Sequence, residues 1–419
     1  MSAIHLPALD STKDLLADPY RFISKNCRQY SQDIFEARIL LKPTYCMTGA
    51  EAAEIFYDNR CFKREGAAPE AIAASLFGKD GVQQLDDGAH KVRKAMFMSI
   101  MAPDHIDGLV QRFLNELEHD ALRWSQEGQV RLYDAMQRLL TRAVCDWAGV
   151  PVAQHELADR TEQLASLFDS AAVDFKGHLQ SRRMRHNAER WISELIKRVR
   201  AKRFQSPADS VLYAVASHID ADGRPLDEHT CAVELLNVLR PTVAVSVYLV
   251  FVAHALRLHP ASRPNIAAGD QEYTQWFVDE IRRFYPFFPA VAARVRQDFR
   301  WKGILFPEGR RVMLDLYGTN HDPRLWQQPE IFEPLRFKIT PITPYNFIPQ
   351  GGADPNTGHR CPGEVITLAL MHAAARFFAE RMEYRLPPES LQLDMGRMPP
   401  VPRNRFLMQR VSLGYRYAA

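Results

Sequence analysis

The stretch "FIPQGGADPNTGHRCPGEV" (347–365) holds one cysteine in an unusual setting. Glycines and a proline surround Cys361, and the basic residues His359 and Arg360 directly precede it. The apolar run 365–378 predicts a helix that begins just after the cysteine. Glycines let backbone N–H groups approach the sulfur, and a helix N-terminus favours negative charge there. The pattern therefore indicates a thiolate, formed because these groups lower the pKa of the thiol.

An isolated cysteine of this kind suits the axial thiolate ligand of a haem iron, although an inert buried cysteine at a helix start remains the alternative. Two further segments favour the haem ligand. "EIRR" (280–283) places Glu280 and Arg283 on one helix face, and the irregular loop "YGTNHDPRLWQQPEIFEPLRF" (317–337) contains Arg336. In this order the three segments resemble the cytochrome P-450 superfamily. The resemblance covers nearly the whole chain and implies haem b, with Cys361 as the iron ligand and Arg336 tied to the Glu280–Arg283 pair.

Composition limits the other classes of protein. The chain has 419 residues, of which 46% are hydrophobic and 25% charged, as in a globular protein with a sizeable core. A net charge of +3 is too small to favour nucleic acid. Six scattered cysteines without a CxxC pair argue against a disulfide framework or a zinc site. The N-terminus has no apolar signal segment, and the apolar run 241–256 is too short for a confident membrane span. We expect a soluble cytoplasmic protein with no membrane span.

Helical periodicity dominates the chain, so the fold class is expected to be mainly α with a small β portion. The resemblance implies the cytochrome P-450 fold, as a single haem-thiolate domain over residues 1–419. The region 286–361 is rich in Pro and Gly and is expected to be ordered loop. The basic run 180–190 is expected to be a solvated helix face. Helices are predicted near 89–101, 131–148, 181–204, 228–258, 271–285 and 363–381, and strands near 37–49, 311–317 and 405–415.

The cysteine loop departs from the usual family pattern. Most members have a Phe seven residues before the cysteine and a Gly four before it, and here these positions are Asp354 and Thr357. Phe347 lies fourteen residues before the cysteine, so the loop is lengthened, for a reason that the sequence does not give. His359 matches the basic position that meets a haem propionate in the family.

The predicted central helix lacks the acid–Thr pair with which ordinary members of the superfamily activate dioxygen. "RPTVA" (240–244) stands in its place. Arg240 could be a surface residue at a helix break made by Pro241. Its neighbours are apolar, however, so we expect a buried guanidinium, which requires an anion. No acid lies within four residues of it, and a substrate carboxylate bound in bidentate fashion would fit.

This Arg-Pro pair resembles a bacterial branch of the superfamily, the fatty-acid peroxygenases, as do "RRFYPFFPAVAARV" (282–295) and "FGKDGVQQLDDGAHKVRKAMF" (77–97). The resemblance implies that hydrogen peroxide is used directly, without a redox partner. It also implies that the carboxylate of a long-chain fatty acid, paired with Arg240, acts as the acid–base group, and that the product is a 2- or 3-hydroxy acid. Arg240, Pro241 and Gln83 are the expected catalytic residues, with Pro241 opening the helix locally.

Other residues complete the expected site. Family members that hydroxylate have Gln where Gln83 stands and one that forms terminal alkenes has His. A neutral amide cannot donate a proton as imidazolium can, which favours hydroxylation. Gln84 is the alternative for this position. The alkyl tail is expected to contact Phe77, Phe288 and Val291, although each could equally be a core residue.

Haem propionates require cations. His90 and Lys94 share a helix face at i and i+4, where most family members carry Trp-x-x-x-Arg. Arg64 matches a further propionate contact in the family, and Arg93 could substitute for Lys94. The alternative for "KVRK" (91–94) is a solvated basic face.

Three alternatives to the hydroxylase stay open. The protein could be a fatty acid decarboxylase that gives terminal alkenes, or a monooxygenase that draws electrons from a ferredoxin or flavoprotein. It could also be a haem carrier or sensor that binds fatty acid without turnover. Regiochemistry, chain length and oligomeric state do not follow from the sequence.

Overall fold

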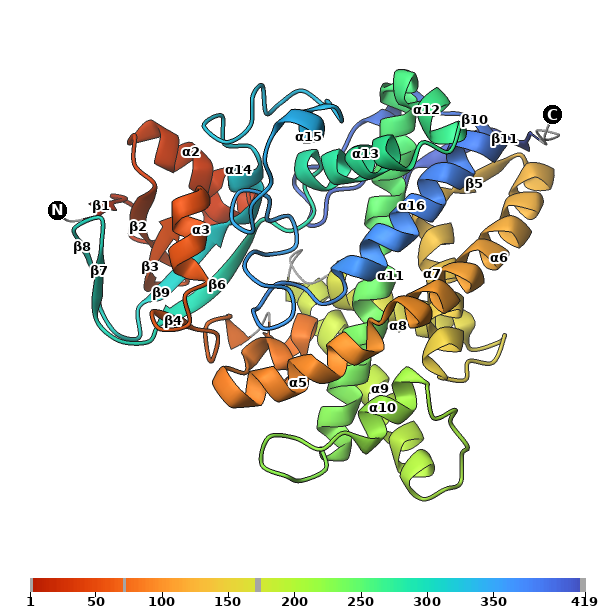
Figure 1. Cartoon of the computed structure of the whole chain (residues 1–419), viewed down its shortest axis with the longest axis horizontal. Coiled ribbons are helices and arrows are strands. Elements are labelled where there is room, and N and C mark those ends of the chain that lie inside the picture. Colours follow the sequence, from red (N-terminus) through yellow and green to blue (C-terminus); the bar gives the residue numbers. More distant parts are fainter. Residues whose placement is uncertain (1–2, 71–72, 170–174, 415–419) are drawn as a thin grey trace.

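The helical half of the protein is built around α11 (Glu228–Leu258), which passes through its middle (Figure 1). The computed structural model describes residues 3–70, 73–169 and 175–414. Helix α11 is apolar on all sides and almost every residue in it is buried, because α7, α8, α9 and α16 pack around it. The Asp227 side chain accepts a hydrogen bond from the Thr230 N–H (2.9 Å) and caps the helix start.

The other helices of this half pack on α11 or on its neighbours through apolar inner faces. They are α5 (Asp87–Ile100), α6 (Pro103–Glu127), α7 (Leu132–Ala148), α8 (Leu157–Asp169), α9 (Phe175–Arg200), α10 (Val211–Ser217), α12 (Arg263–Ala267), α13 (Gln271–Phe284) and α16 (Glu364–Arg381). A three-stranded sheet lies beside this group, in the order β10 (Met382–Arg385), β11 (Leu407–Leu413) and β5 (Gln129–Arg131).

A six-stranded sheet forms the other side of the molecule (Figure 1). Its order is β1 (Ile4–His5), β2 (Ile34–Ile39), β3 (Lys42–Met47), β9 (Arg311–Asp315), β6 (Ala290–Val295) and β4 (Phe62–Lys63). Strand β3 pairs with β9 in parallel, and β6 pairs with β9 antiparallel. The sheet thus joins segments that are far apart in the chain. A separate hairpin consists of β7 (Phe299–Trp301) and β8 (Ile304–Phe306).

Short helices complete the sheet side and the connections. They are α1 (Thr12–Ala17), α2 (Phe22–Gln29), α3 (Ala50–Phe56), the π-helix η1 (Ala73–Phe77), the 3₁₀ turns η2 (Val82–Gln84), η3 (Pro260–Ser262) and η4 (Pro388–Leu391), α14 (Leu316–Asn320) and α15 (Arg336–Ile339).

The mainly helical class with a small β portion is confirmed, and the predicted helices are found with ends shifted by a few residues. The prediction that 286–361 is loop is wrong in part. This region contains β6 to β9, α14 and α15, since strand pairing with distant segments orders it. The predicted strand 405–415 is β11, although residue 415 lies outside the described residues.

Helix α11 contains Pro241 yet runs on without a break. Proline removes the backbone N–H that would bond the carbonyl of Asn237, four residues earlier, so one helical hydrogen bond is missing. The helix opening expected at Pro241 is therefore limited to the loss of this one hydrogen bond. Within the described residues, α11 is the one helix whose length and apolar composition match a membrane span, and 94% of its most apolar stretch is buried in the fold.

Candidate active site

Backbone contacts fix the loop that carries Cys361. The Cys361 N–H donates to the Gln350 carbonyl (3.1 Å). Gly351 has φ of 96°, and a Cβ there would lie 3.1 Å from the Tyr57 hydroxyl, so only glycine suits this position. Gly363 caps α16, and its N–H bonds to the sulfur. The predicted cluster of backbone amides and helix N-terminus around the sulfur is therefore present.

Glu364, the first residue of α16, anchors this loop to α13. Its carboxylate accepts hydrogen bonds from Arg282, on α13, and from Arg360 (Nη2–Oε1 2.8 Å). Arg282 also donates from Nε to the Gln350 side chain (3.2 Å). The cysteine is thus held from both ends of its loop by one buried cation.

The Gly363 N–H lowers the pKa of the Cys361 thiol, as predicted, but burial of the sulfur outweighs this effect. Burial raises this pKa, and the nearby Glu364 carboxylate adds to the rise. The Gly363 N–H, Lys94 and Arg240 act in the opposite direction but do not outweigh burial. A metal cation on the sulfur would reverse the balance, because coordination deprotonates a thiol.

Glu280, Arg283 and Arg336 form a buried charge triad. The Arg283 guanidinium donates two hydrogen bonds to the Glu280 carboxylate (2.7 and 2.8 Å), and Arg336 donates a third (3.1 Å). The Arg336 side chain also donates to the Gln327 carbonyl (2.6 Å), which fixes the irregular loop after α14. The sequence prediction that joins these three residues is confirmed.

Arg240 is buried near the middle of α11, with 7% of its surface exposed. Its Nε atom has no hydrogen-bond partner, and no described carboxylate lies within 4.0 Å of the guanidinium. Burial, aided by the charge of Arg185, lowers the pKa of Arg240 to about 9, while the Cys361 thiolate acts in the other direction. The alternative of a surface residue is therefore excluded. The structure places an unpaired cation close enough to Cys361 for each to shift the pKa of the other.

Arg185 is a residue that the sequence reasoning missed. It lies in the run 180–190, but its side chain is buried, so the expectation of a solvated face is wrong there. Its Nε bonds Glu189 (2.6 Å), and a second nitrogen donates to the Phe77 carbonyl (3.3 Å). The i, i+4 spacing of Arg185 and Glu189 is visible in the sequence. The sequence does not show that the Arg185 side chain points inward.

Gln83 lies in η2 and faces α11. The Asn237 side-chain amide, one turn before Arg240, donates to the Gln83 Oε1 atom (3.3 Å). Asn237 also donates to Glu234 (3.0 Å), whose carboxylate is fully buried and accepts from Arg93 (2.6 Å). Arg93 is thus engaged away from the cysteine and does not substitute for Lys94.

Gln84 points the other way from Gln83, because its side-chain nitrogen donates to the Gly78 carbonyl (2.7 Å). Of the two candidates, Gln83 is the one joined to α11. Glu234 and Asn237, which hold this arrangement, were also missed by the sequence reasoning. Their spacing from Arg240 on one helix was the available signal.

The four predicted propionate contacts lie in one buried cluster. The rings of His90 and His359 are 4.1 Å apart, and Lys94 donates to the Arg360 carbonyl. Burial lowers the pKa of His90 to about 3, of His359 to about 4 and of Lys94 to about 8. The "KVRK" residues Arg93 and Lys94 are therefore not a solvated face.

Arg64 completes this cluster and stacks on the Phe56 ring at 4.4 Å. Burial also lowers the pKa of the Arg64 guanidinium. Asp86 lies beside His359 (3.6 Å) and bonds the backbone N–H of Arg64. Burial opposes ionisation of the Asp86 carboxyl, but the bonds from His359 and the backbone hold its pKa at about 2. The buried basic groups of this cluster outnumber the carboxylates beside them. They therefore fit a ligand that itself carries two carboxylates.

The residues expected around the alkyl tail are partly buried. Phe77 ends η1, Phe288 precedes β6, and Val291 lies in β6. Phe288 contacts both the large helical core and the core beside the sheet, whereas Phe77 contacts the first and Val291 the second. The structure thus brings them to the junction of the two cores.

No three His, Cys, Asp or Glu side chains converge as metal ligands in the described ranges, and the six cysteines are unpaired. A lone cysteine beside a buried cluster of basic groups fits a metal that arrives with its own ring of nitrogen ligands, as haem iron does. The residues present therefore fit haem, with Cys361 at the iron and His90, Lys94, His359 and Arg64 near the propionates.

Fold and site together define a cytochrome P450. The cytochrome P450 family model matches residues 268–379, the part that contains the Glu280–Arg283 pair and the cysteine loop. Solved structures extend the match to almost the whole chain. A point mutant of cytochrome P450SP alpha (CYP152B1) is 47% identical, with a TM-score of 0.95, covering 97% of this chain and 100% of that one.

Cytochrome P450EX alpha (CYP152N1), solved with myristic acid, is 40% identical with a TM-score of 0.94, over 99% of this chain and 100% of that one. Among curated proteins, protopanaxadiol 6-hydroxylase of Panax ginseng is 21% identical over 378 residues, which are 83% of this chain and 78% of that protein. The chain belongs to the CYP152 family, the fatty-acid peroxygenase branch of the cytochromes P450. It is a haem-thiolate oxidoreductase by family.

Proposed function

We propose that the protein catalyses hydrogen-peroxide-dependent hydroxylation of long-chain fatty acids at the α or β carbon. The observation that carries the proposal is Arg240, a buried guanidinium that lies close to Cys361 and has no carboxylate within 4.0 Å among the described residues. A substrate carboxylate would supply the missing charge and bring the first carbons of the chain to the haem side. The binding of myristic acid by P450EX alpha supports this class of substrate.

Haem bound through the Cys361 thiolate supplies the cleavage of the peroxide O–O bond and the transfer of oxygen. Among the described residues, the titratable groups that act on Arg240 are Arg185 and Cys361, and neither is a carboxylic acid. A carboxylate held by Arg240 can take a proton from hydrogen peroxide and return it to the oxygen that leaves as water. Overall, one C–H bond becomes C–OH, and the peroxide gives one oxygen to the product and one to water.

Gln83 favours hydroxylation over alkene formation. Its Oε1 atom is engaged by Asn237, so its side-chain N–H₂ is the end free to face a substrate. An amide donates a hydrogen bond but does not release a proton at neutral pH. The alkyl tail would extend toward Phe77, Phe288 and Val291. Pro241 leaves one backbone carbonyl of α11 without its helical partner, close to Arg240.

The test is turnover by haem-loaded protein with myristic acid and hydrogen peroxide, without any reductase. We expect 2- or 3-hydroxymyristic acid by mass spectrometry, and loss of this product in Arg240→Ala with haem content unchanged. The matched control is Arg257→Ala, an exposed arginine on the same helix, which should keep full turnover. Haem-replete protein that gives no product would exclude the proposal. Unchanged turnover in Arg240→Ala would exclude the carboxylate role.

We further propose that residues 1–419 fold as one haem-thiolate domain, that no redox partner is required, and that the protein is cytoplasmic. Turnover that needs a ferredoxin or flavoprotein and fails with peroxide alone would refute the second point.

A further inference from the structure

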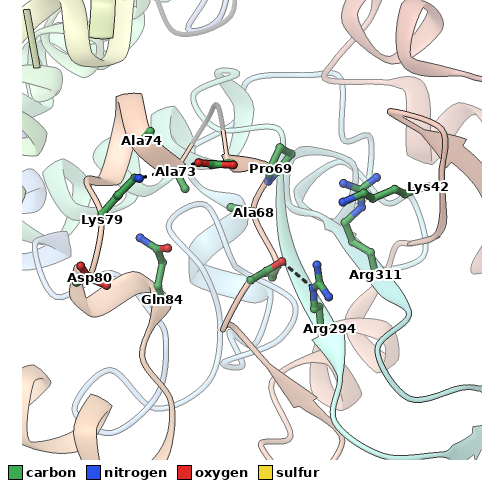
Figure 2. Close-up of a pocket in the computed structure, with 13 residues that line it drawn as sticks. Lys42, Ala68, Pro69, Ala73, Ala74, Lys79, Asp80, Gln84, Arg294 and Arg311 are labelled. Atoms are coloured by element: carbon green, nitrogen blue, oxygen red, sulfur yellow. Dashed lines mark hydrogen bonds and ion pairs between the residues drawn. The ribbon is translucent and has the colours of Figure 1, made fainter. Parts of the chain in front are cut away.

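A second pocket, of about 360 Å³, lies between η1 and the six-stranded sheet (Figure 2). None of the residues assigned to the candidate active site lines it. Segment 66–70 and η1 form one wall, and strands β3, β6 and β9 form the other. We call it the outer basic pocket, lined by Lys42, Gly66, Ala67, Ala68, Pro69, Glu70, Ala73, Ala74, Lys79, Asp80, Gln84, Arg294 and Arg311.

Positive charge is in excess in this pocket, because four cationic side chains face two carboxylates. Lys79 and Glu70 pair loosely with each other across 4.0 Å, and both are largely exposed. The remaining cations are Lys42, Arg294 and Arg311. No carboxylate of the described residues lies within 4.0 Å of their nitrogens, and Figure 2 shows the three side chains together on the sheet side.

The two arginines stand directly opposite each other on neighbouring strands, as the register pairs Arg294 with Arg311. Like charges in this position destabilise a sheet. Both are held by neutral acceptors: Arg311 by Thr44 Oγ1 (3.0 Å) and a backbone carbonyl, and Arg294 by the Gly66 carbonyl (2.7 Å). Each guanidinium has five N–H donors, so several stay free for an anion. Arg311 is 7% exposed, and its burial adds to the cost of the unpaired charge.

The same face of the sheet continues with apolar side chains. Residues two apart in a strand share a face, so the next pair inward from Arg294 and Arg311 is Ala292 with Met313. Both are only partly buried, but Met313 packs against the core cluster that contains Phe35 and Cys46, so Ala292 is the one with open surface. This step along the strand is about 7 Å. A charged end followed by a partly exposed apolar residue suits a molecule with an anionic head and an alkyl chain.

We propose that the outer basic pocket binds the carboxylate of a second long-chain fatty acid, with its alkyl chain leaving past Ala292. The guanidinium groups match a carboxylate in shape and charge. The inference takes its ligand class from the proposed function but not its site, because the pocket shares no residue with the Arg240 position. The protein would then hold two acids at once, one at Arg240 and one at the sheet.

The experiment counts bound myristic acid per haem-loaded protein by equilibrium dialysis at low salt. We expect two in the wild type and one in the double variant Lys42→Gln/Arg294→Gln, with the outer affinity weakened roughly 10-fold or more. Arg311 is kept because its bonds join two strands. Arg300→Gln is the matched control, an exposed arginine of β7 outside the pocket, and should keep two.

Arg240→Gln separates this inference from the proposed function. Loss of the inner acid with the outer one retained supports both. If the wild type binds one myristic acid and the double variant binds one with the same affinity, the outer site is wrong. This conclusion does not depend on the result for Arg240→Gln. Inorganic phosphate is the second probe. If the double variant loses phosphate but still binds two myristates, the pocket is a simple oxyanion site and the fatty acid inference is wrong.

Discussion

Replacing Arg240 with leucine should stabilise the protein when no fatty acid is present. The buried guanidinium has no carboxylate within 4.0 Å among the described residues, and burial lowers its pKa from the ordinary arginine value to about 9. At about 1.4 kcal/mol per unit, this shift corresponds to an upper limit of about 5 kcal/mol of destabilisation. The pH dependence of this destabilisation follows from the positive charge of the guanidinium. The cost belongs to the protonated form, so it is complete below pH 9 and fades as the pH rises from 9 toward the ordinary pKa of arginine.

Leucine removes the buried charge and keeps most of the apolar contacts, so a gain of about 2–4 kcal/mol at pH 7 is expected. For a protein of 419 residues this gain corresponds to roughly 2–5 °C in melting temperature. The second half of the prediction concerns the ligand. Saturating myristic acid at 100 times the Kd of the Arg240 site should stabilise the wild type by about 2.7 kcal/mol more than it stabilises Arg240→Leu, which keeps the outer basic pocket.

The assay is calorimetric melting of haem-loaded protein with and without myristic acid. Arg257→Leu, at an exposed position of α11, controls for the substitution itself and should keep the response to acid. The reasoning fails if Arg240→Leu melts below the wild type without acid. It fails equally if the acid raises the melting temperature of the variant as much as that of the wild type.

Three further predictions follow from the site. Gln83→His should raise the share of terminal alkene over hydroxy acid, because imidazolium can release a proton, and gas chromatography of the products measures it. Glu280→Gln should lower the free energy of unfolding by about 3–5 kcal/mol, since it leaves Arg283 and Arg336 buried without their anion; a change under 1 kcal/mol in denaturant titrations would contradict the role of the triad. Asp86→Asn should remove stability that the wild type has above about pH 4 and loses as the pH falls toward 2. After screening by solvent this is about 1–2 kcal/mol, and unfolding free energies of the two proteins should converge at low pH.

The sequence predicts most of the helical part of the fold. Helices α11, α13 and α16 end within a residue or two of their expected limits, because long apolar periodicity and capping residues are local signals. Strand β6 escaped prediction, since its six residues are defined by pairing with β9 and β4 rather than by a local pattern. The fold is therefore predictable where the stabilising contacts lie along one helix.

The residues of the candidate site likewise fall into those that the sequence predicts and those that it does not. Cys361 and the Glu280–Arg283 pair follow from residue type and order. The partners of adjacent basic residues do not, because successive side chains of a helix point about 100° apart. Arg93 reaches Glu234, whereas its neighbour Lys94 reaches the cysteine loop. The net direction of the pKa shift of the Cys361 thiol could not be predicted from the sequence either, because burial depends on every element packed around the sulfur.

The parallel pairing of β3 with β9 has a consequence for synthesis on the ribosome. About 260 residues separate the two strands, and at about 5–20 residues per second β3 waits roughly 13–50 seconds for its neighbour. During that time the β2–β3 hairpin exposes an open edge that other nascent chains could join. Lys42, at the start of β3, places a charge on this edge, and charged edges resist such association. Lys42 would thus protect the growing chain from association before the same side chain lines the outer basic pocket.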